Sequence, residues 1–185
     1  MNPKFNEKFD LSHLNNLSIA VVSDTHTVLD DDVRKIVEAC DIVIHAGDIG
    51  SLEVIESLKP KRGLAFGVAG NNDKPYLWDM PGWEFLKTLP DSIEITVPGG
   101  VIAVEHGHAH DMHKPSHDDL RAAHKDCRAV VYGHTHHQII DNSHTNCWVL
   151  NPGAAGNVRT HGGPSCLKLN VSDENWDIES YRFTN

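Results

Sequence analysis

Five short apolar stretches of this chain end abruptly in residues that bind metal ions, and this pattern limits the folds it can adopt. Each stretch has the length of a buried strand and stops at aspartate, asparagine or histidine. In parallel α/β sheets the loops at the carboxyl ends of the strands meet at one crevice, so such endings come together in space. The five endings are SDTH (23–26), GD (47–48), GNND (70–73), EHGH (105–108) and GHTH (133–136).

The segments between these endings predict an α/β fold. Residues 30–40 place apolar side chains at the i, i+3, i+4 and i+7 positions of one helix face. Residues 51–59 and 116–127 predict two further helices, each with a serine as its cap. Parallel strands are expected within 17–73, and later hairpins complete two packed mixed β-sheets flanked by helices. The expected hairpins lie around 98–100, around 142–143 and within 165–183.

The length of 185 residues fits one domain with a full core. We expect residues 1–16 to form a polar N-terminal extension and residues 17–185 to form a single domain. No apolar run is long enough to span a membrane, and the N-terminus lacks the apolar segment of a secretory signal. The four cysteines form no C-x-x-C pair, so we expect reduced thiols in a cytoplasmic protein without membrane partners.

The charge and the ligand types narrow the chemistry. A formal net charge of −10 argues against a protein that coats nucleic acid, but bound cations would still allow an anionic substrate. Carboxylate, amide and imidazole ligands without thiolate suit Mn, Fe, Co, Ni or Zn ions rather than a closed structural zinc site. Seven candidate ligands are too many for one tetrahedral ion and suit two ions that share a carboxylate. They are Asp24, His26, Asp48, Asn71, His106, His134 and His136.

With these motifs in this order, the chain resembles the calcineurin-like metallophosphoesterases, and more narrowly the small YfcE-type phosphodiesterases. The resemblance covers nearly all of residues 17–185 and includes the late NPGAAG segment. It implies two mixed sheets flanked by helices and two divalent ions, with Mn²⁺ expected first and Ni²⁺, Co²⁺, Fe²⁺ or Zn²⁺ as alternatives. It assigns one ion to Asp24, His26, Asp48 and His136, and the other to Asp48, Asn71, His106 and His134, with Asp48 bridging.

The resemblance also implies a reaction. A hydroxide between two divalent ions is a strong nucleophile near neutral pH and can attack phosphorus in line. Asp48 and Asn71 would serve catalysis as ligands, Asn72 and His108 would contact the substrate, and the substrate would be a small phosphate ester, by preference a phosphodiester. Many enzymes of the wider superfamily have GNH where this chain has Asn72, and an amide cannot donate a proton at neutral pH. We therefore predict that the leaving group is protonated weakly, or by water or His108, and that esters with acidic leaving groups react faster.

Two residues near the motifs keep two interpretations each. Asp73 either orients a ligand histidine from the second shell or caps a turn. Arg159, which follows the NPGAAG segment, either neutralises a substrate phosphate or is an ordinary surface arginine.

Other functions compete with the enzyme. A catalytically silent scaffold that acts through protein contacts has a precedent in the retromer subunit of this fold. Loss of the bridging aspartate and of the first asparagine would mark a scaffold, and this chain retains both Asp48 and Asn71. A serine/threonine protein phosphatase would carry a longer signature after GD than GDIGSLEV, whereas a nucleotide hydrolase stays open. Proteins with this core often self-associate, so a homo-oligomer is a further expectation.

Overall fold

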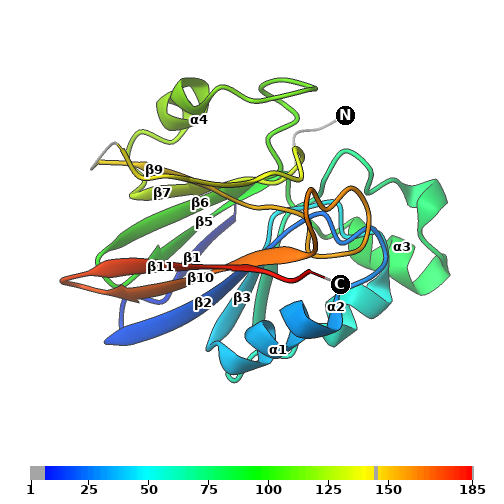
Figure 1. Cartoon of the computed structure of the whole chain (residues 1–185), viewed down its shortest axis with the longest axis horizontal. Coiled ribbons are helices and arrows are strands. Elements are labelled where there is room, and N and C mark those ends of the chain that lie inside the picture. Colours follow the sequence, from blue (N-terminus) through cyan, green and yellow to red (C-terminus); the bar gives the residue numbers. More distant parts are fainter. Residues whose placement is uncertain (1–6, 144–145, 185) are drawn as a thin grey trace.

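Two mixed β-sheets pack against each other in the computed structural model, which describes residues 7–143 and 146–184 (Figure 1). The expected fold class is confirmed. In spatial order, the six-stranded sheet consists of β1 (Glu7–Asp10), β5 (Ser92–Val97), β6 (Gly100–Glu105), β7 (Ala129–Val131), β9 (Trp148–Pro152) and β8 (Gln138–Asp141). The five-stranded sheet consists of β11 (Trp176–Arg182), β10 (Ser165–Ser172), β2 (Asn16–Val22), β3 (Ile42–His45) and β4 (Leu64–Gly67).

Helices cover the outer faces of the sandwich. On the five-stranded sheet, Val33 and Val37 bury one face of the first helix against Ala20 and Val43 of the strands. On the six-stranded sheet, Leu120 of the last helix packs against a separate outer cluster. The helices are α1 (Asp31–Ala39), α2 (Leu52–Ser57), the 3₁₀ turn η1 (Pro75–Leu77), α3 (Met80–Leu86) and α4 (His117–Ala123).

The main core lies between the sheets. Val21 of β2 and Ile44 of β3 belong to the same buried cluster as Ile93 and Ile95 of β5. Alternate strand residues point to opposite faces, and Ala20, Val22 and Val43, which flank these positions in β2 and β3, are buried in the cluster with α1. Burial on both faces explains why these strands are continuous apolar runs in the sequence.

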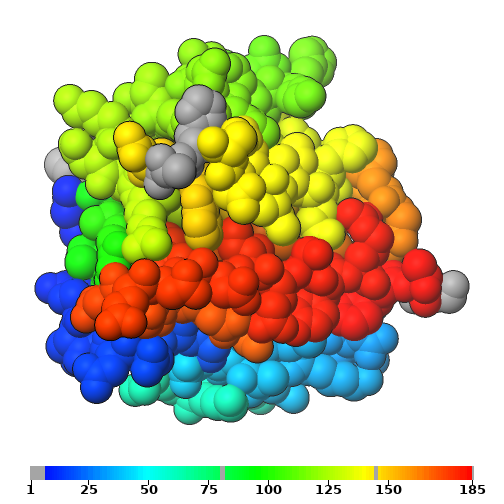
Figure 2. Space-filling model, turned by 60° about the vertical axis from the view of Figure 1, so that its left-hand side comes forward, coloured from blue at the N-terminus to red at the C-terminus, as the bar shows by residue number. Residues whose placement is uncertain are grey.

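The strand directions bring the predicted loops to one edge. β2, β3 and β4 pair in parallel in one sheet, and β6 and β7 pair in parallel in the other. The closing strands β10 and β11 run antiparallel beside β2. In Figure 2 these closing strands, in orange and red, lie between the blue N-terminal part and the yellow and green second half of the chain.

Three features differ from the sequence-based expectations. Residues 7–10 of the expected polar extension form strand β1, which pairs in parallel with β5, whereas residues 1–6 lie outside the described part. η1 and α3 were not expected, and Trp78 between them is buried against Leu86. Ser51 precedes α2 without a capping side-chain bond, whereas Ser116 does cap α4 through the Asp119 N–H.

Among the residues that the structure describes, no helix has both the length and the apolarity needed to cross a bilayer.

Candidate metal centre

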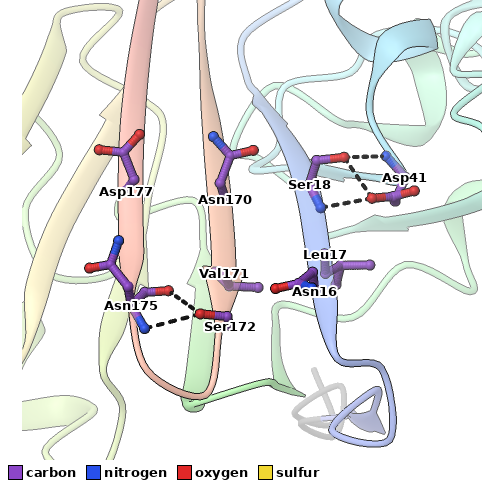
Figure 3. Close-up of a pocket in the computed structure, with 9 residues that line it drawn as sticks. All are labelled: Asn16, Leu17, Ser18, Asp41, Asn170, Val171, Ser172, Asn175 and Asp177. Atoms are coloured by element: carbon purple, nitrogen blue, oxygen red, sulfur yellow. Dashed lines mark hydrogen bonds between the residues drawn. The ribbon is translucent and has the colours of Figure 1, made fainter.

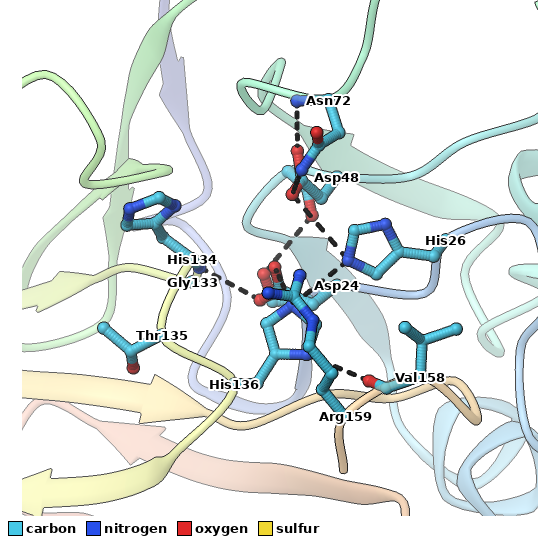
Figure 4. A network of polar contacts seen from close by, with 12 residues as sticks. Asp24, His26, Asp48, Asn72, Gly133, His134, Thr135, His136, Val158 and Arg159 are labelled. Atoms are coloured by element: carbon cyan, nitrogen blue, oxygen red, sulfur yellow. Dashed lines mark hydrogen bonds and ion pairs between the residues drawn. The ribbon is translucent and has the colours of Figure 1, made fainter. Parts of the chain in front are cut away.

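The seven predicted ligands lie in loops that follow the carboxyl ends of five parallel strands and meet at one edge of the molecule. Figure 4 shows five of them, Asp24, His26, Asp48, His134 and His136. Asp24 and His26 follow β2, Asp48 follows β3, and Asn71 follows β4. His106 follows β6 directly, and His134 and His136 follow β7. The two sheets therefore contribute ligands from opposite sides of the same crevice.

Five of the seven predicted ligands have left-handed backbones. The φ angles lie between 45° and 69°. Such conformations are uncommon without glycine and persist where the surroundings impose them, often at functional sites. Here the loops impose them on each other, because the Asp24 and His26 N–H groups donate to the carbonyls of Gly47 and Asp48 at 3.0 Å each. The five residues are Asp24, His26, Asp48, His134 and His136.

Two glycines allow the carboxylates to approach the loop backbones. A Cβ at Gly70 would collide with the Asp48 carboxylate and with the Asp48 N–H. A Cβ at Gly133 would collide with the Ser23 hydroxyl and lie 2.8 Å from Asp24 Oδ2. The glycines of the GNND and GHTH motifs thus have a steric reason to be there.

Three of the histidines are oriented by backbone carbonyls. The Nδ1 of His106 lies 2.7 Å from the Ala46 carbonyl, and the Nδ1 of His136 lies 3.0 Å from the Val158 carbonyl. His134 uses its other nitrogen, with Nε2 at 2.9 Å from the Met112 carbonyl. A carbonyl only accepts, so each of these nitrogens carries a proton and the opposite nitrogen is the one that can present a lone pair to a cation. Histidines that bind metals are commonly fixed in this way.

The first group of ligands brings acceptors close together. His136 Nε2 lies 3.3 Å from Asp24 Oδ1 and 3.1 Å from His26 Nε2. Asp24 Oδ1 is buried and has no hydrogen-bond donor among the described residues. One ligand atom of each of these three residues lies within 4.8 Å of the others. A shared cation would satisfy lone pairs that otherwise face one another.

The second group repeats this arrangement. The Asn71 Oδ1 lies 3.1 Å from His106 Nε2 and 2.9 Å from His134 Nδ1, the two nitrogens that carry lone pairs. Asp48 Oδ2 lies 3.4 Å from the same His106 nitrogen. It also lies 3.8 Å from His26 Nε2 of the first group. One carboxylate oxygen thus faces both groups, as a bridging ligand must.

The charges at this edge favour a cation. Burial disfavours the charged form of His106, but the carboxylates of Asp48 and Asp24 outweigh it and raise the pKa of His106 to about 9. Burial also opposes ionisation of Asp48, yet hydrogen bonds from His106 and Asn72 hold the pKa of Asp48 well below its usual range. In the absence of metal, a proton on His106 supplies part of the positive charge that a bound cation would supply.

The two asparagines of GNND have different roles. Asn71 faces the ligand histidines, whereas Asn72 donates to Asp48, with the backbone N–H at 2.8 Å from Oδ1 and the side-chain amide at 2.7 Å from Oδ2. Asn72 is exposed, so a substrate can reach it for the predicted contact.

Of the two interpretations of Asp73, the contacts favour the turn cap over a partner of a ligand histidine. Its buried carboxylate accepts the backbone N–H groups of Ile49, Gly50 and Gly70 at 2.9 to 3.2 Å. A carboxylate beside three backbone donors is well placed to hold a turn. Asp73 therefore fixes the loop after β4 against the loop after β3, which carries Asp48.

His108 lies beside the ligands rather than among them. Its Nδ1 is buried without a hydrogen-bond partner in the described part of the chain, and its ring centre is 5.5 Å from that of His106. Burial, and then the charges of His106 and His134, lower the pKa of His108. A cavity of about 670 Å³ opens next to it, lined also by Lys74, Asp91 and Ser92.

Three residues at the site have a role that the motifs did not indicate. Arg159 is an exposed arginine, and its Nη2 also lies 3.1 Å from His136 Nε2 (Figure 4). Asn151 of the NPGAAG segment is buried and donates to the Gly133 carbonyl at 2.7 Å, which supports the loop of His134. His45, fully buried at the end of β3, was hidden in an apolar run. In the sequence, only the NPGAAG segment pointed to Arg159 and Asn151 as residues near the site.

A second pocket has different chemistry. It occupies about 280 Å³ at the amino end of β2, the opposite end from Asp24, and several of its polar groups already bond one another (Figure 3). The Ser18 hydroxyl donates to Asp41 at 2.7 Å, and the backbone N–H of Asn175 donates to the Ser172 hydroxyl at 3.0 Å. It holds no comparable group of ligands.

Comparisons with known proteins agree with this geometry. Residues 17–174 match the calcineurin-like phosphoesterase superfamily domain. A protein named phosphodiesterase MJ0936, from Methanocaldococcus jannaschii, is 28% identical over 148 residues, which cover 74% of this chain and 83% of that protein. A probable metallophosphoesterase of the same organism, MJ0623, is 32% identical over 165 residues, which cover 84% of this chain and 77% of that protein.

Solved structures show the same fold at lower identity. Vacuolar protein sorting 29 from Cryptosporidium parvum superposes with a TM-score of 0.70 at 19% identity, covering 93% of this chain and all of that chain. A structure described as a novel archaeal phosphodiesterase gives a TM-score of 0.62 at 24% identity, covering 89% of this chain and all of that chain. The matched domain takes in all five strand endings, so the chain belongs to the calcineurin-like phosphoesterase superfamily.

Proposed function

We propose that this chain is a metal-dependent phosphoesterase that acts by preference on phosphodiesters. The supporting observation is the convergence of imidazole, amide and carboxylate lone pairs with few donors between them. Two bound divalent ions would supply a nucleophile from water near neutral pH and offset the charge of the phosphate oxygens. The family and the relative named as a phosphodiesterase support the same class of reaction.

The chain's own residues would divide the work. Asp24, His26 and His136 form one ligand group, Asn71, His106 and His134 form the other, and Asp48 joins them through Oδ2. Hydrogen bonds from Asn72 hold the Asp48 carboxylate in place. Oxygen and nitrogen ligands without sulfur suit Mn²⁺, Ni²⁺, Co²⁺, Fe²⁺ and Zn²⁺, and Mn²⁺, which the family resemblance puts first, would be tested first.

Leaving-group protonation would be the weak step. Asn72 donates hydrogen bonds but no proton, and a lowered pKa makes His108 mostly neutral at pH 7. His108 can still donate one N–H to a substrate oxygen. Aryl esters, whose leaving groups need little protonation, should therefore react faster than alkyl esters of the same phosphate. Equal rates on the two would contradict this assignment.

The experiment is hydrolysis of bis-p-nitrophenyl phosphate by chelator-stripped protein, with and without added Mn²⁺. We expect activity that depends on the ion and is lost in Asp48→Asn. Asp31→Asn is the matched control, because Asp31 lies on the exposed surface of α1 and the same carboxylate-to-amide change there should leave activity intact.

The alternative, a catalytically silent scaffold of the same fold, predicts a different outcome of this experiment. The likeness to vacuolar protein sorting 29 concerns the fold alone. Folded protein with measured metal content but no turnover with Mn²⁺, Ni²⁺, Co²⁺, Fe²⁺ or Zn²⁺ would refute the enzyme and favour the scaffold.

A further inference from the structure

A second group of metal-binding side chains lies apart from the candidate metal centre, beneath the end of α4. Glu94 comes from β5, His124 ends α4, and Cys127 lies in the turn that leads to β7. One ligand atom of each residue lies within 4.8 Å of the other two. Ligands around a tetrahedral ion, each about 2.0 to 2.3 Å from it, stand at comparable separations.

His124 is already oriented as a ligand histidine would be. Its Nε2 lies 2.7 Å from Oε2 of Glu105, a largely buried carboxylate on β6. With Nε2–H donated to this carboxylate, Nδ1 is left with the lone pair. The arrangement of carboxylate, histidine and metal recurs in metalloproteins because the carboxylate fixes the ring and strengthens the ligand.

Cys127 supplies a buried sulfur in a fixed position. The side chain is 4% exposed, and the Cys127 N–H donates to the His124 carbonyl at 3.0 Å, so one turn carries both ligands. Burial, followed by the charge of Glu94, raises the pKa of Cys127 to about 11. The thiol therefore keeps its proton unless a bound cation displaces it.

Glu94 has one competing partner. The Lys8 ammonium lies 2.6 Å from Glu94 Oε2, but the Lys8 side chain is 74% exposed. An exposed ion pair of this kind contributes little, so an ion could displace the ammonium into solvent.

We propose that Glu94, His124 and Cys127 form a zinc site that is separate from the candidate metal centre. Thiolate, imidazole and carboxylate together suit Zn²⁺ and its analogue Co²⁺ and discriminate against Mn²⁺, which prefers oxygen ligands. Water would complete the coordination. The ion would join α4 and the turn after it to strand β5, and through Glu105 to the strand that precedes His106. The site does not depend on the proposed function.

The test uses the absorption of Co²⁺. Sulfur bound to Co²⁺ gives a near-ultraviolet charge-transfer band, whereas the candidate metal centre has no sulfur ligand and gives none. We expect the band when Co²⁺ is added to the stripped, reduced protein, and its loss when Zn²⁺ is added in excess but not when Mn²⁺ is added. The band should persist in Asp48→Asn, which disables the other centre.

Matched variants locate the sulfur. Cys127→Ala should abolish the band, whereas Cys147→Ala, which removes a buried thiol of the same cluster, should keep it. Lys8→Met should tighten zinc binding and Glu94→Gln should weaken it by about tenfold or more in a competition with a chelating dye. Circular dichroism confirms that each variant is folded. Absence of the band in folded wild-type protein, or its persistence in Cys127→Ala, would overturn the proposal.

Discussion

Acid should destabilise this fold through His45, a residue outside the ligand set. Its Nδ1 accepts the Gly47 N–H at 3.2 Å, and its Nε2 lies 2.9 Å from the Thr25 hydroxyl, which in turn donates to the Ile49 carbonyl at 2.9 Å. This network is complete for a neutral ring, and an added proton would face the Gly47 N–H. Burial, which outweighs the nearby carboxylates, lowers the pKa of His45 from 6.5 to about 4.

The size and sign follow from the two pKa values. As the pH falls from about 6.5 to about 4, the unfolded chain protonates His45 while the folded chain does not, so the free energy of unfolding decreases. At about 1.4 kcal/mol per pKa unit, the difference between 6.5 and about 4 corresponds to about 3.5 kcal/mol, of which about 3 kcal/mol is lost by pH 4. That is a large part of the stability of an ordinary domain.

Urea unfolding of chelator-stripped protein between pH 7 and pH 4 measures this effect. His45→Gln is the comparison, because its amide can accept from Gly47 and donate to Thr25 but does not titrate. Wild type should lose about 3 kcal/mol more than the variant across this range. Other titrating groups contribute equally to both proteins. Parallel pH curves for wild type and variant would refute the reasoning.

Three further predictions concern the candidate metal centre. Asp73→Asn should lower the free energy of unfolding by about 1 to 3 kcal/mol in urea, because an amide cannot accept from all three N–H groups; an unchanged midpoint would contradict this. Arg159→Ala should raise KM for bis-p-nitrophenyl phosphate more than it lowers kcat, whereas Arg62→Ala, at an exposed arginine paired with Asp41, should change neither. Asn72→His should narrow the difference in rate between aryl and alkyl esters, and an unchanged ratio would argue against a missing proton donor.

The sequence was sufficient to predict most of the fold because local signals and burial agree there. The parallel strands β2 and β3 are apolar on both faces, and α1 has one apolar face and an aspartate cap, Asp30. β1 could not be predicted in this way. Its residues Glu7–Asp10 are mostly exposed and polar, and the strand exists because β5 offers a free edge for pairing. Edge pairing leaves no hydrophobic pattern in the sequence.

The convergence of the candidate ligands was more predictable than the groups that orient them. Aspartate and histidine at strand ends are visible in the chain, and the parallel topology brings such ends together. The groups that orient them are backbone carbonyls, such as those of Ala46 and Val158, and any residue can supply a carbonyl. The position of Asp73 under two loops likewise depends on how those loops pack, so its partners could not be read from the motif.

The details of the candidate metal centre favour a bound cation over a scaffold that has kept the motifs without using them. Asp24 Oδ1 is buried without a donor among the described residues, and unpartnered buried acceptors reduce stability. The left-handed backbones at aspartate and histidine reduce the stability of the metal-free fold further, by about 1 to 3 kcal/mol each. A surface that served only protein contacts would gain nothing from such strain, and substitution of a single ligand would relieve part of it. Two cations, one in each ligand group, would offset these terms together, because between them they would bind the converging lone pairs. The same strain that weakens the metal-free fold would therefore preorganise the ligands for the ions.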